Sequence, residues 1–156
     1  MPGEDSVKKG YKKALDNGLK NIHLLEGTHI VTGLDVKFEV PMTVSGDGRE
    51  KTFVEGGGFW IEGEEDQHCT FFDMTIQKTK GTGLKGWNGM GEDGMSFDCR
   101  RVKFDKCGGC GVAAQNTKGR LTNCQVTNCK RSGIYSYGDS YDSTIEIEGE
   151  ESRINN

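Results

Sequence analysis

The chain has 156 residues, of which 33% are hydrophobic, and its formal net charge is −4 at pH 7. This length fits one domain, and the low hydrophobic content suits a solenoid, which needs few inward side chains, better than a globule with a broad interior. The negative charge repels phosphate backbones and anionic membrane surfaces, so we expect neither nucleic acid nor a membrane as a partner.

Residues 1–20 predict a short capping helix. Its apolar side chains have the spacing of an amphipathic helix: Val7, Tyr11, Ala14 and Leu15. Ser6 can cap the N-terminus of this helix, and Asn17 with Gly18 supplies a C-terminal stop. We expect the helix to cover the first coil of a solenoid that residues 21–156 form, so that the whole chain is one domain.

The rest of the chain is rich in glycine and consists of short β-like runs. The first five of these runs are residues 22–25, 36–40, 42–44, 52–54 and 59–61. Four glycines followed by an apolar residue recur at intervals of 25, 28 and 22 residues: Gly58-Phe59, Gly83-Leu84, Gly111-Val112 and Gly133-Ile134. Each later pair follows two strands whose apolar residues lie five apart: Phe71 and Ile76, Phe97 and Val102, and Leu121 and Val126. We expect Phe71, Phe97 and Leu121 to stack in register, and Ile145 to begin the pattern again. Three short strands per interval, without helices between them, are typical of a parallel β-helix.

The segment NIHLLEGTHIVTG, followed by MTVSGDG and FVEGGGF, resembles the first coil of the pectate-lyase-like β-helix superfamily. The resemblance covers roughly residues 21–156 and points to no specific member. It implies an all-β fold, a right-handed parallel β-helix of about four to six coils behind the short N-terminal helix. Carbohydrate-active members bind polysaccharide along one sheet, so the resemblance also implies a polysaccharide or glycan partner.

In the strands that follow the repeated glycines, alternation points the first apolar residue inward and its neighbours outward. Two outward rows are expected: Trp60, Lys85, Ala113 and Tyr135, and beside them Glu62, Trp87, Gln115 and Tyr137. Aromatic rings stack on the C–H faces of sugars while polar groups bond hydroxyls, so this face is a candidate carbohydrate site. The substrate-binding candidates are the seven functional side chains in these rows: Trp60, Glu62, Lys85, Trp87, Gln115, Tyr135 and Tyr137. The alternative is that these aromatics only cover one another or an interface, because aromatics favour strands in general.

The candidates for catalytic residues are weaker than those for sugar binding. Lyases of the superfamily hold Ca²⁺ in an acidic cluster, and no such cluster is visible, so we expect no metal and no cofactor. Glu62 and Lys85 lie one coil apart and could act as acid and base, although an exposed ion pair is the alternative. Asp139 and Asp142 are the nearest feature to the aspartates of the hydrolases, but a polar turn explains them better. His68 follows three acidic residues and is best explained as part of a solvated turn.

The cysteines offer a CxxC pair and two further thiols to a zinc ion: Cys107, Cys110, Cys124 and Cys129. Cys107 and Cys129 each precede an inward residue by five positions, however, so buried thiols in a ladder are the preferred interpretation. No stretch is apolar enough for a signal peptide or a membrane span, so we expect a cytoplasmic protein with reduced thiols, or a secreted one whose signal peptide was removed. The turn asparagines could form amide ladders: Asn116, Asn123 and Asn128. His23 and His29 have no recognisable partners.

Three functional classes follow from these features. We rank a carbohydrate-binding or interaction module above a polysaccharide lyase, epimerase or hydrolase-like enzyme. The third class is a structural or self-assembling scaffold. Its basis is the last segment, IEIEGEESRINN, which shows no capping helix and therefore predicts an open edge through which a homodimer could form.

Overall fold

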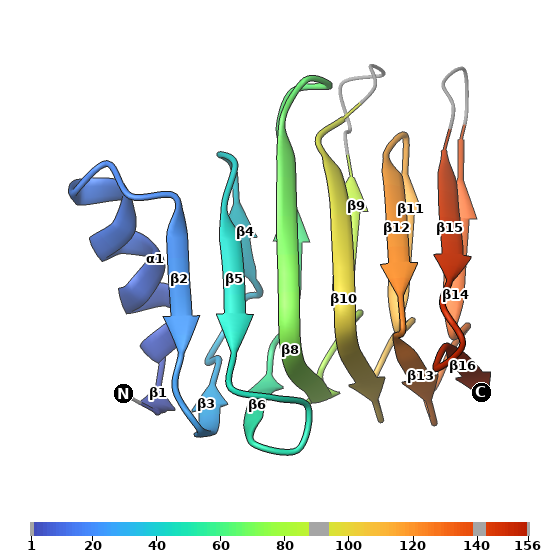
Figure 1. Ribbon diagram of the computed structural model, residues 1–156, viewed down its shortest axis with the longest axis horizontal. Helices are drawn as coiled ribbons and strands as arrows, with labels where there is room; N and C mark the ends of the chain where they lie inside the picture. Colours follow the sequence, from blue (N-terminus) through green and yellow to red (C-terminus); the bar gives the residue numbers. More distant parts are fainter. Residues whose placement is uncertain (1, 88–93, 139–142, 156) are drawn as a thin grey trace.

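The computed structural model describes residues 2–87, 94–138 and 143–155. These residues form a parallel β-solenoid of about six turns behind one short helix, as Figure 1 shows. The expected all-β parallel solenoid with an N-terminal helix is therefore confirmed. Each turn contributes a few inward side chains to one continuous buried cluster, which is why a chain with so little hydrophobic content can fill its core.

One wall of the solenoid is a five-stranded parallel sheet in the order β14-β11-β9-β7-β4. Its strands are β4 (Val36–Phe38), β7 (Phe59–Ile61), β9 (Leu84–Trp87), β11 (Val112–Gln115) and β14 (Ile134–Tyr137). Phe59 pairs with Leu84, Leu84 with Val112, and Val112 with Ile134. The repeated glycine and apolar pairs therefore mark one coil each, as predicted.

The other two walls belong to one sheet of eleven strands within the described ranges. The front wall in Figure 1 contains β2 (Asn21–Leu24), β5 (Thr43–Gly46), β12 (Lys118–Thr122) and β15 (Thr144–Glu148). The third wall contains β1 (Gly3–Glu4), β3 (Gly27–Ile30), β6 (Thr52–Gly56), β13 (Gln125–Thr127) and β16 (Arg153–Asn155). Two long strands, β8 (His68–Thr79) and β10 (Ser96–Asp105), run through both walls and join them.

A single residue with left-handed backbone makes the bend between these two walls in three successive coils. Asp73, Arg101 and Asn123 have φ values of 54°, 53° and 53°. One such residue redirects the chain without a loop, so both walls remain one sheet. The predicted turn asparagines do occupy left-handed positions: the amide of Asn128 donates to Asp105 (3.1 Å), and Oδ1 of Asn123 accepts from the backbone N–H of Glu151 (3.2 Å).

The register of the front wall differs from the sequence interpretation by two residues. Phe71 and Leu121 both pair with Cys99 and not with Phe97. Likewise Leu121 pairs with Ile147, again two residues beyond the predicted partner. A slip of two leaves every side chain on the same face, so the hydrophobic pattern cannot detect it. The predicted inward face was right and the predicted stacking was wrong.

Helix α1 (Ser6–Asp16) covers the N-terminal end of the core, as Figure 1 shows. Val7 is fully buried, and the ring of Tyr11 lies edge-on to Phe38 with the centroids 4.8 Å apart. The helix ends before Asn17, as predicted. With 11 residues it is too short to cross a membrane, and no other described helix is long and apolar enough to do so.

The N-terminus of α1 corrects two expectations. Asp5, with φ 54°, is the capping position, and Ser6 is already helical. The Asp5 carboxylate does not cap the helix; it accepts a hydrogen bond from the N–H of Thr32 (2.9 Å). The Ser6 hydroxyl instead lies 2.7 Å from Nδ1 of His29, so His29 is a buried, partnered histidine.

Candidate functional site

The outward side of the five-stranded sheet carries the two rows that the sequence predicts. Trp60 pairs with Lys85, and Ala113 pairs with both Lys85 and Tyr135. In the second row, Gln115 pairs with Trp87 on one side and with Tyr137 on the other. Glu62 directly follows β7 and extends this row. The sequence-predicted residues therefore lie on one face of the solenoid.

Trp60 is enclosed by two lysines from the neighbouring strands. The ammonium groups of Lys37 and Lys85 lie 5.2 and 5.0 Å from its ring centroid, and Lys85 is also 5.4 Å from the centroid of Trp87. The two indole rings meet edge-on at 5.4 Å. Such cation–π contacts order the lysines. Trp60 therefore serves to position Lys85, and lysines from both neighbouring strands lie over its ring.

Glu62 is paired with Lys37 and not with Lys85, the partner that the predicted acid–base pair requires. Its carboxylate lies 2.9 Å from the ammonium group of Lys37, and this hydrogen bond raises the pKa of Lys37 above its ordinary value. Lys85 is engaged with the two indole rings. The two catalytic candidates are thus held by separate contacts, and their acid–base role stays a prediction.

A hollow of about 420 Å³ opens on this face over β9, β11 and β14, and neither tryptophan lines it. Three predicted residues line it: Lys85, Gln115 and Tyr135. Its other wall comes from the residues that precede the repeated glycines in three successive coils: Thr82, Cys110 and Ser132. Sequence reasoning missed this wall, although the coil interval locates all three residues. The hollow offers an aromatic ring, an amide and an ammonium group to one ligand.

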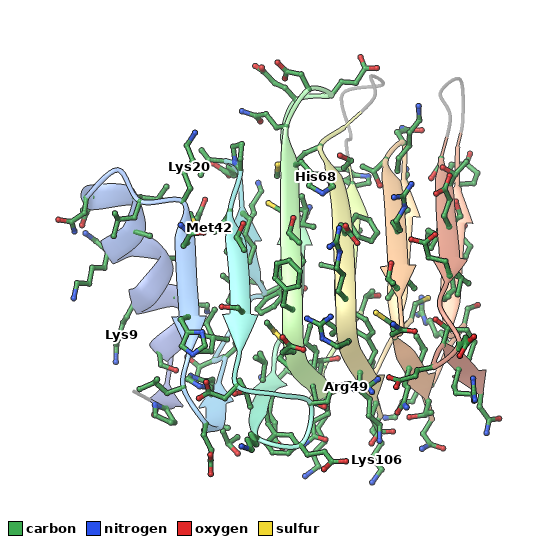
Figure 2. The ribbon with its side chains drawn as sticks, viewed as in Figure 1. Lys9, Lys20, Met42, Arg49, His68 and Lys106 are labelled. Atoms are coloured by element: carbon green, nitrogen blue, oxygen red, sulfur yellow. The ribbon has the colours of Figure 1, made fainter. Side chains whose placement is uncertain are left out.

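A second hollow, of about 430 Å³, lies on the front wall and was not predicted. His68 lies at its rim, where Figure 2 shows it at the start of β8. It is therefore a strand residue and not part of a solvated turn. Its Nδ1 lies 2.6 Å from the hydroxyl of Ser96, and partial burial lowers the pKa of His68 below its ordinary value.

Asp98 lines the same hollow but is only 7% exposed. Its Oδ2 accepts two hydrogen bonds from the guanidinium of Arg100, at 3.2 and 3.0 Å. Its Oδ1 is buried and has no hydrogen-bond partner among the described residues. Arg120, which also lines this hollow, is bound to Glu146 at 3.0 Å. Most charges of the second hollow are thus already paired within the protein.

His23 has two partners that sequence reasoning did not find. Its Nδ1 lies 2.9 Å from the hydroxyl of Ser45, and its Nε2 lies 2.9 Å from Oδ1 of Asp47. The two partners follow His23 by 22 and 24 residues, which is one coil. The coil interval was therefore the signal that could have identified this cluster.

All six cysteines are free thiols, and four of them are buried. Burial raises the pKa of Cys107 to about 12 and that of Cys69 and Cys124 to about 11. Cys129, by contrast, is partly exposed. No group of three or more His, Cys, Asp or Glu side chains in residues 2–87, 94–138 and 143–155 could hold a metal ion. The aspartates at 139 and 142 lie outside the described residues.

No protein-family model matches the chain, and neither does any curated protein. Among solved structures, the chain is similar to the crystal structure of a putative glycosyl hydrolase from Parabacteroides merdae ATCC 43184, with a TM-score of 0.30 and 10% sequence identity. The match covers 99% of this chain and 88% of that chain.

Proposed function

We propose that the hollow on the five-stranded sheet binds a glycan. The observation that supports this is the composition of its lining, in which an exposed tyrosine ring stands beside an amide and an ordered ammonium group. Sugars present C–H faces that stack on aromatic rings and hydroxyls that need fixed polar partners. This lining supplies both within about 420 Å³.

Tyr135 is the ring that we expect to stack on the sugar. It is 48% exposed and lines the hollow, whereas Trp60 does not line it and has two lysines over its ring. Gln115 can donate to and accept from hydroxyls, and Lys85 can donate from a position fixed by two indole rings. Tyr137, also exposed on this face, lies two residues beyond Tyr135 on β14 and extends the platform.

The test is affinity electrophoresis in gels that contain polygalacturonate, alginate, xylan or hydroxyethyl cellulose. We expect at least one polysaccharide to retard the protein. Tyr135→Ala should weaken that binding about two- to tenfold, because a stacked ring contributes about 0.5–1.5 kcal/mol. Lys85→Gln should weaken it as well, because it removes the ammonium donor.

The matched control is Phe72→Ala, which removes a partly exposed ring from the front wall, outside the hollow. The retardation of Phe72→Ala should equal that of the unaltered protein. The melting temperatures of all variants should lie within a few degrees of that of the unaltered protein. Equal retardation of Tyr135→Ala and the unaltered protein, or no retardation in any gel, would exclude glycan binding at this hollow.

A further inference from the structure

His23, Ser45 and Asp47 form a hydrogen-bonded chain on the front wall. His23 on β2 is in register with Ser45 on β5, and Asp47 directly follows β5. The distances are 2.9 Å from Ser45 Oγ to His23 Nδ1 and 2.9 Å from His23 Nε2 to Asp47 Oδ1. The other oxygen of Asp47 accepts a hydrogen bond from the backbone N–H of Glu26 at 2.7 Å.

The direction of these hydrogen bonds follows from the carboxylate. Hydrogen bonds from His23 and from the Glu26 N–H lower the pKa of Asp47, so the group is ionised and only accepts. Nε2 of His23 must then carry the proton, and in the neutral ring Nδ1 is left as the acceptor. The hydroxyl of Ser45 therefore donates its proton to Nδ1. The hydrogen-bonded chain therefore contains a nucleophile (Ser45), a base (His23) and a carboxylate that orients the base (Asp47).

We propose that Ser45 is an acyl-accepting nucleophile, with His23 as its general base and Asp47 as the carboxylate that orients the imidazole, and that its substrates are activated carboxylic esters. His23 is half-exposed, so a small ester reaches the pair from solvent. This activity is independent of the glycan hollow, since the three residues belong to a different wall.

The ester is cleaved in two steps, acylation of Ser45 and hydrolysis of the acyl-serine. Ser45 Oγ bonds to the carbonyl carbon while its proton passes to His23 Nδ1. The carbon–oxygen bond to the alcohol then breaks, and the alcohol leaves with the proton from His23. Water next attacks the acyl-serine, again with His23 as base, and releases the carboxylic acid and the free serine.

The strand around Ser45 limits the rate. β5 is paired with β2 on one side and β8 on the other, so its amides serve the ladder and do not form an oxyanion hole. We therefore expect slow acyl transfer that requires a good leaving group. Nitrophenyl acetate supplies one, and it is the probe for the experiment.

The chain contains its own matched comparison. His68 and Ser96 are in register on β8 and β10, and Nδ1 of His68 lies 2.6 Å from the Ser96 hydroxyl. Among residues 2–87, 94–138 and 143–155, no carboxylate is hydrogen-bonded to His68, whose contact with Ser96 is through Nδ1. Ser96 should therefore acylate far more slowly than Ser45, although its contact with histidine is shorter.

The experiment incubates the whole protein with p-nitrophenyl acetate, follows p-nitrophenol release, and locates the acetyl group by peptide mass spectrometry. We expect acetyl on Ser45 in the unaltered protein and none at this position in Ser45→Ala. His23→Gln should slow the acetylation of Ser45 about 100-fold or more, because it removes the base. Asp47→Asn should slow it at least about tenfold, because the imidazole is then free to adopt the wrong tautomer.

Ser96→Ala should react as the unaltered protein does, and Ser45→Cys should retain acyl transfer because a thiol replaces the hydroxyl. Circular dichroism shows whether each variant is folded. The proposal is overturned if acetyl appears only on lysines, if Ser96 is acetylated as fast as Ser45, or if His23→Gln leaves the rate at Ser45 unchanged.

Discussion

Gly119 shows how one inward position depends on a neighbouring ring. It pairs with Phe97 on the adjacent strand, and a Cβ at this glycine would lie 2.2 Å from Cζ of that ring. We expect Gly119→Ala to lower the free energy of unfolding by about 1–3 kcal/mol, because the added methyl overpacks a fully buried site. Urea denaturation measures the difference.

The control for this prediction is Gly81→Ala, because a Cβ at Gly81 meets no atom within 4 Å. This variant should stay within about 0.5 kcal/mol of the unaltered protein. Phe97→Leu, combined with Gly119→Ala, should recover part of the loss, since the smaller side chain makes room. If both glycine variants were equally stable, the ring would not be what excludes a side chain at Gly119.

Helix α1 buries only part of the apolar stripe that the sequence predicts. Val7 is fully buried against the first coil, whereas Leu15, at the C-terminal end of the stripe, is 45% exposed. Val7→Ala should therefore destabilise the protein by about 1–3 kcal/mol, through lost burial and the cavity left behind. Leu15→Ala, the same kind of truncation at an exposed position of the helix, should change stability by less than about 0.5 kcal/mol. Thermal unfolding of both variants measures this, and equal effects would mean that α1 does not cap the core.

At the level of strands, the sequence predicts which side chains face inward but not how neighbouring strands align. The glycine and apolar pairs mark the coils of the five-stranded sheet correctly, because a tight turn fixes the start of each strand. In β8 and β10 the pattern continues through a bend at Asp73 and Arg101, so no turn fixes the register there. A two-residue error then goes unnoticed, as with Phe71.

For the candidate site too, the sequence predicts which residues share a face but not which of them contact one another. The rows of this site could be predicted, because alternation within a strand determines which residues share a face. The partners within the rows could not, because side-chain rotamers decide whether Lys85 lies over Trp60 or beside Glu62. The coil interval would have placed Ser45 next to His23, but it says nothing about the hydrogen bond between them.

At the scale of the whole molecule, the two ends of the solenoid are unequal. One end is covered by α1, whereas the last described coil presents the edges of β14, β15 and β16 (Figure 1). Two of its isoleucines, Ile147 and Ile154, are 46% and 42% exposed. Unpaired strand edges beside exposed apolar side chains favour pairing with a second strand. We expect a second copy of the chain to supply it, so that a homodimer forms through this end.

Charge determines when this dimer forms. Glu146 and Glu148 lie on the edge strand β15 and share one cation, Arg120, so an excess negative charge remains and two copies that meet through this strand repel each other. Salt shortens the range of that repulsion from about 30 Å at 0.01 M to about 3 Å at 1 M, while apolar contacts persist. Light scattering should therefore show a dimer fraction that rises with salt and with protein concentration. Ile147→Glu should keep the protein monomeric at 1 M salt, whereas Leu34→Glu, a change at an exposed leucine far from this coil in the sequence, should not. A molecular mass that stays monomeric at every salt and protein concentration would rule out assembly through the last coil.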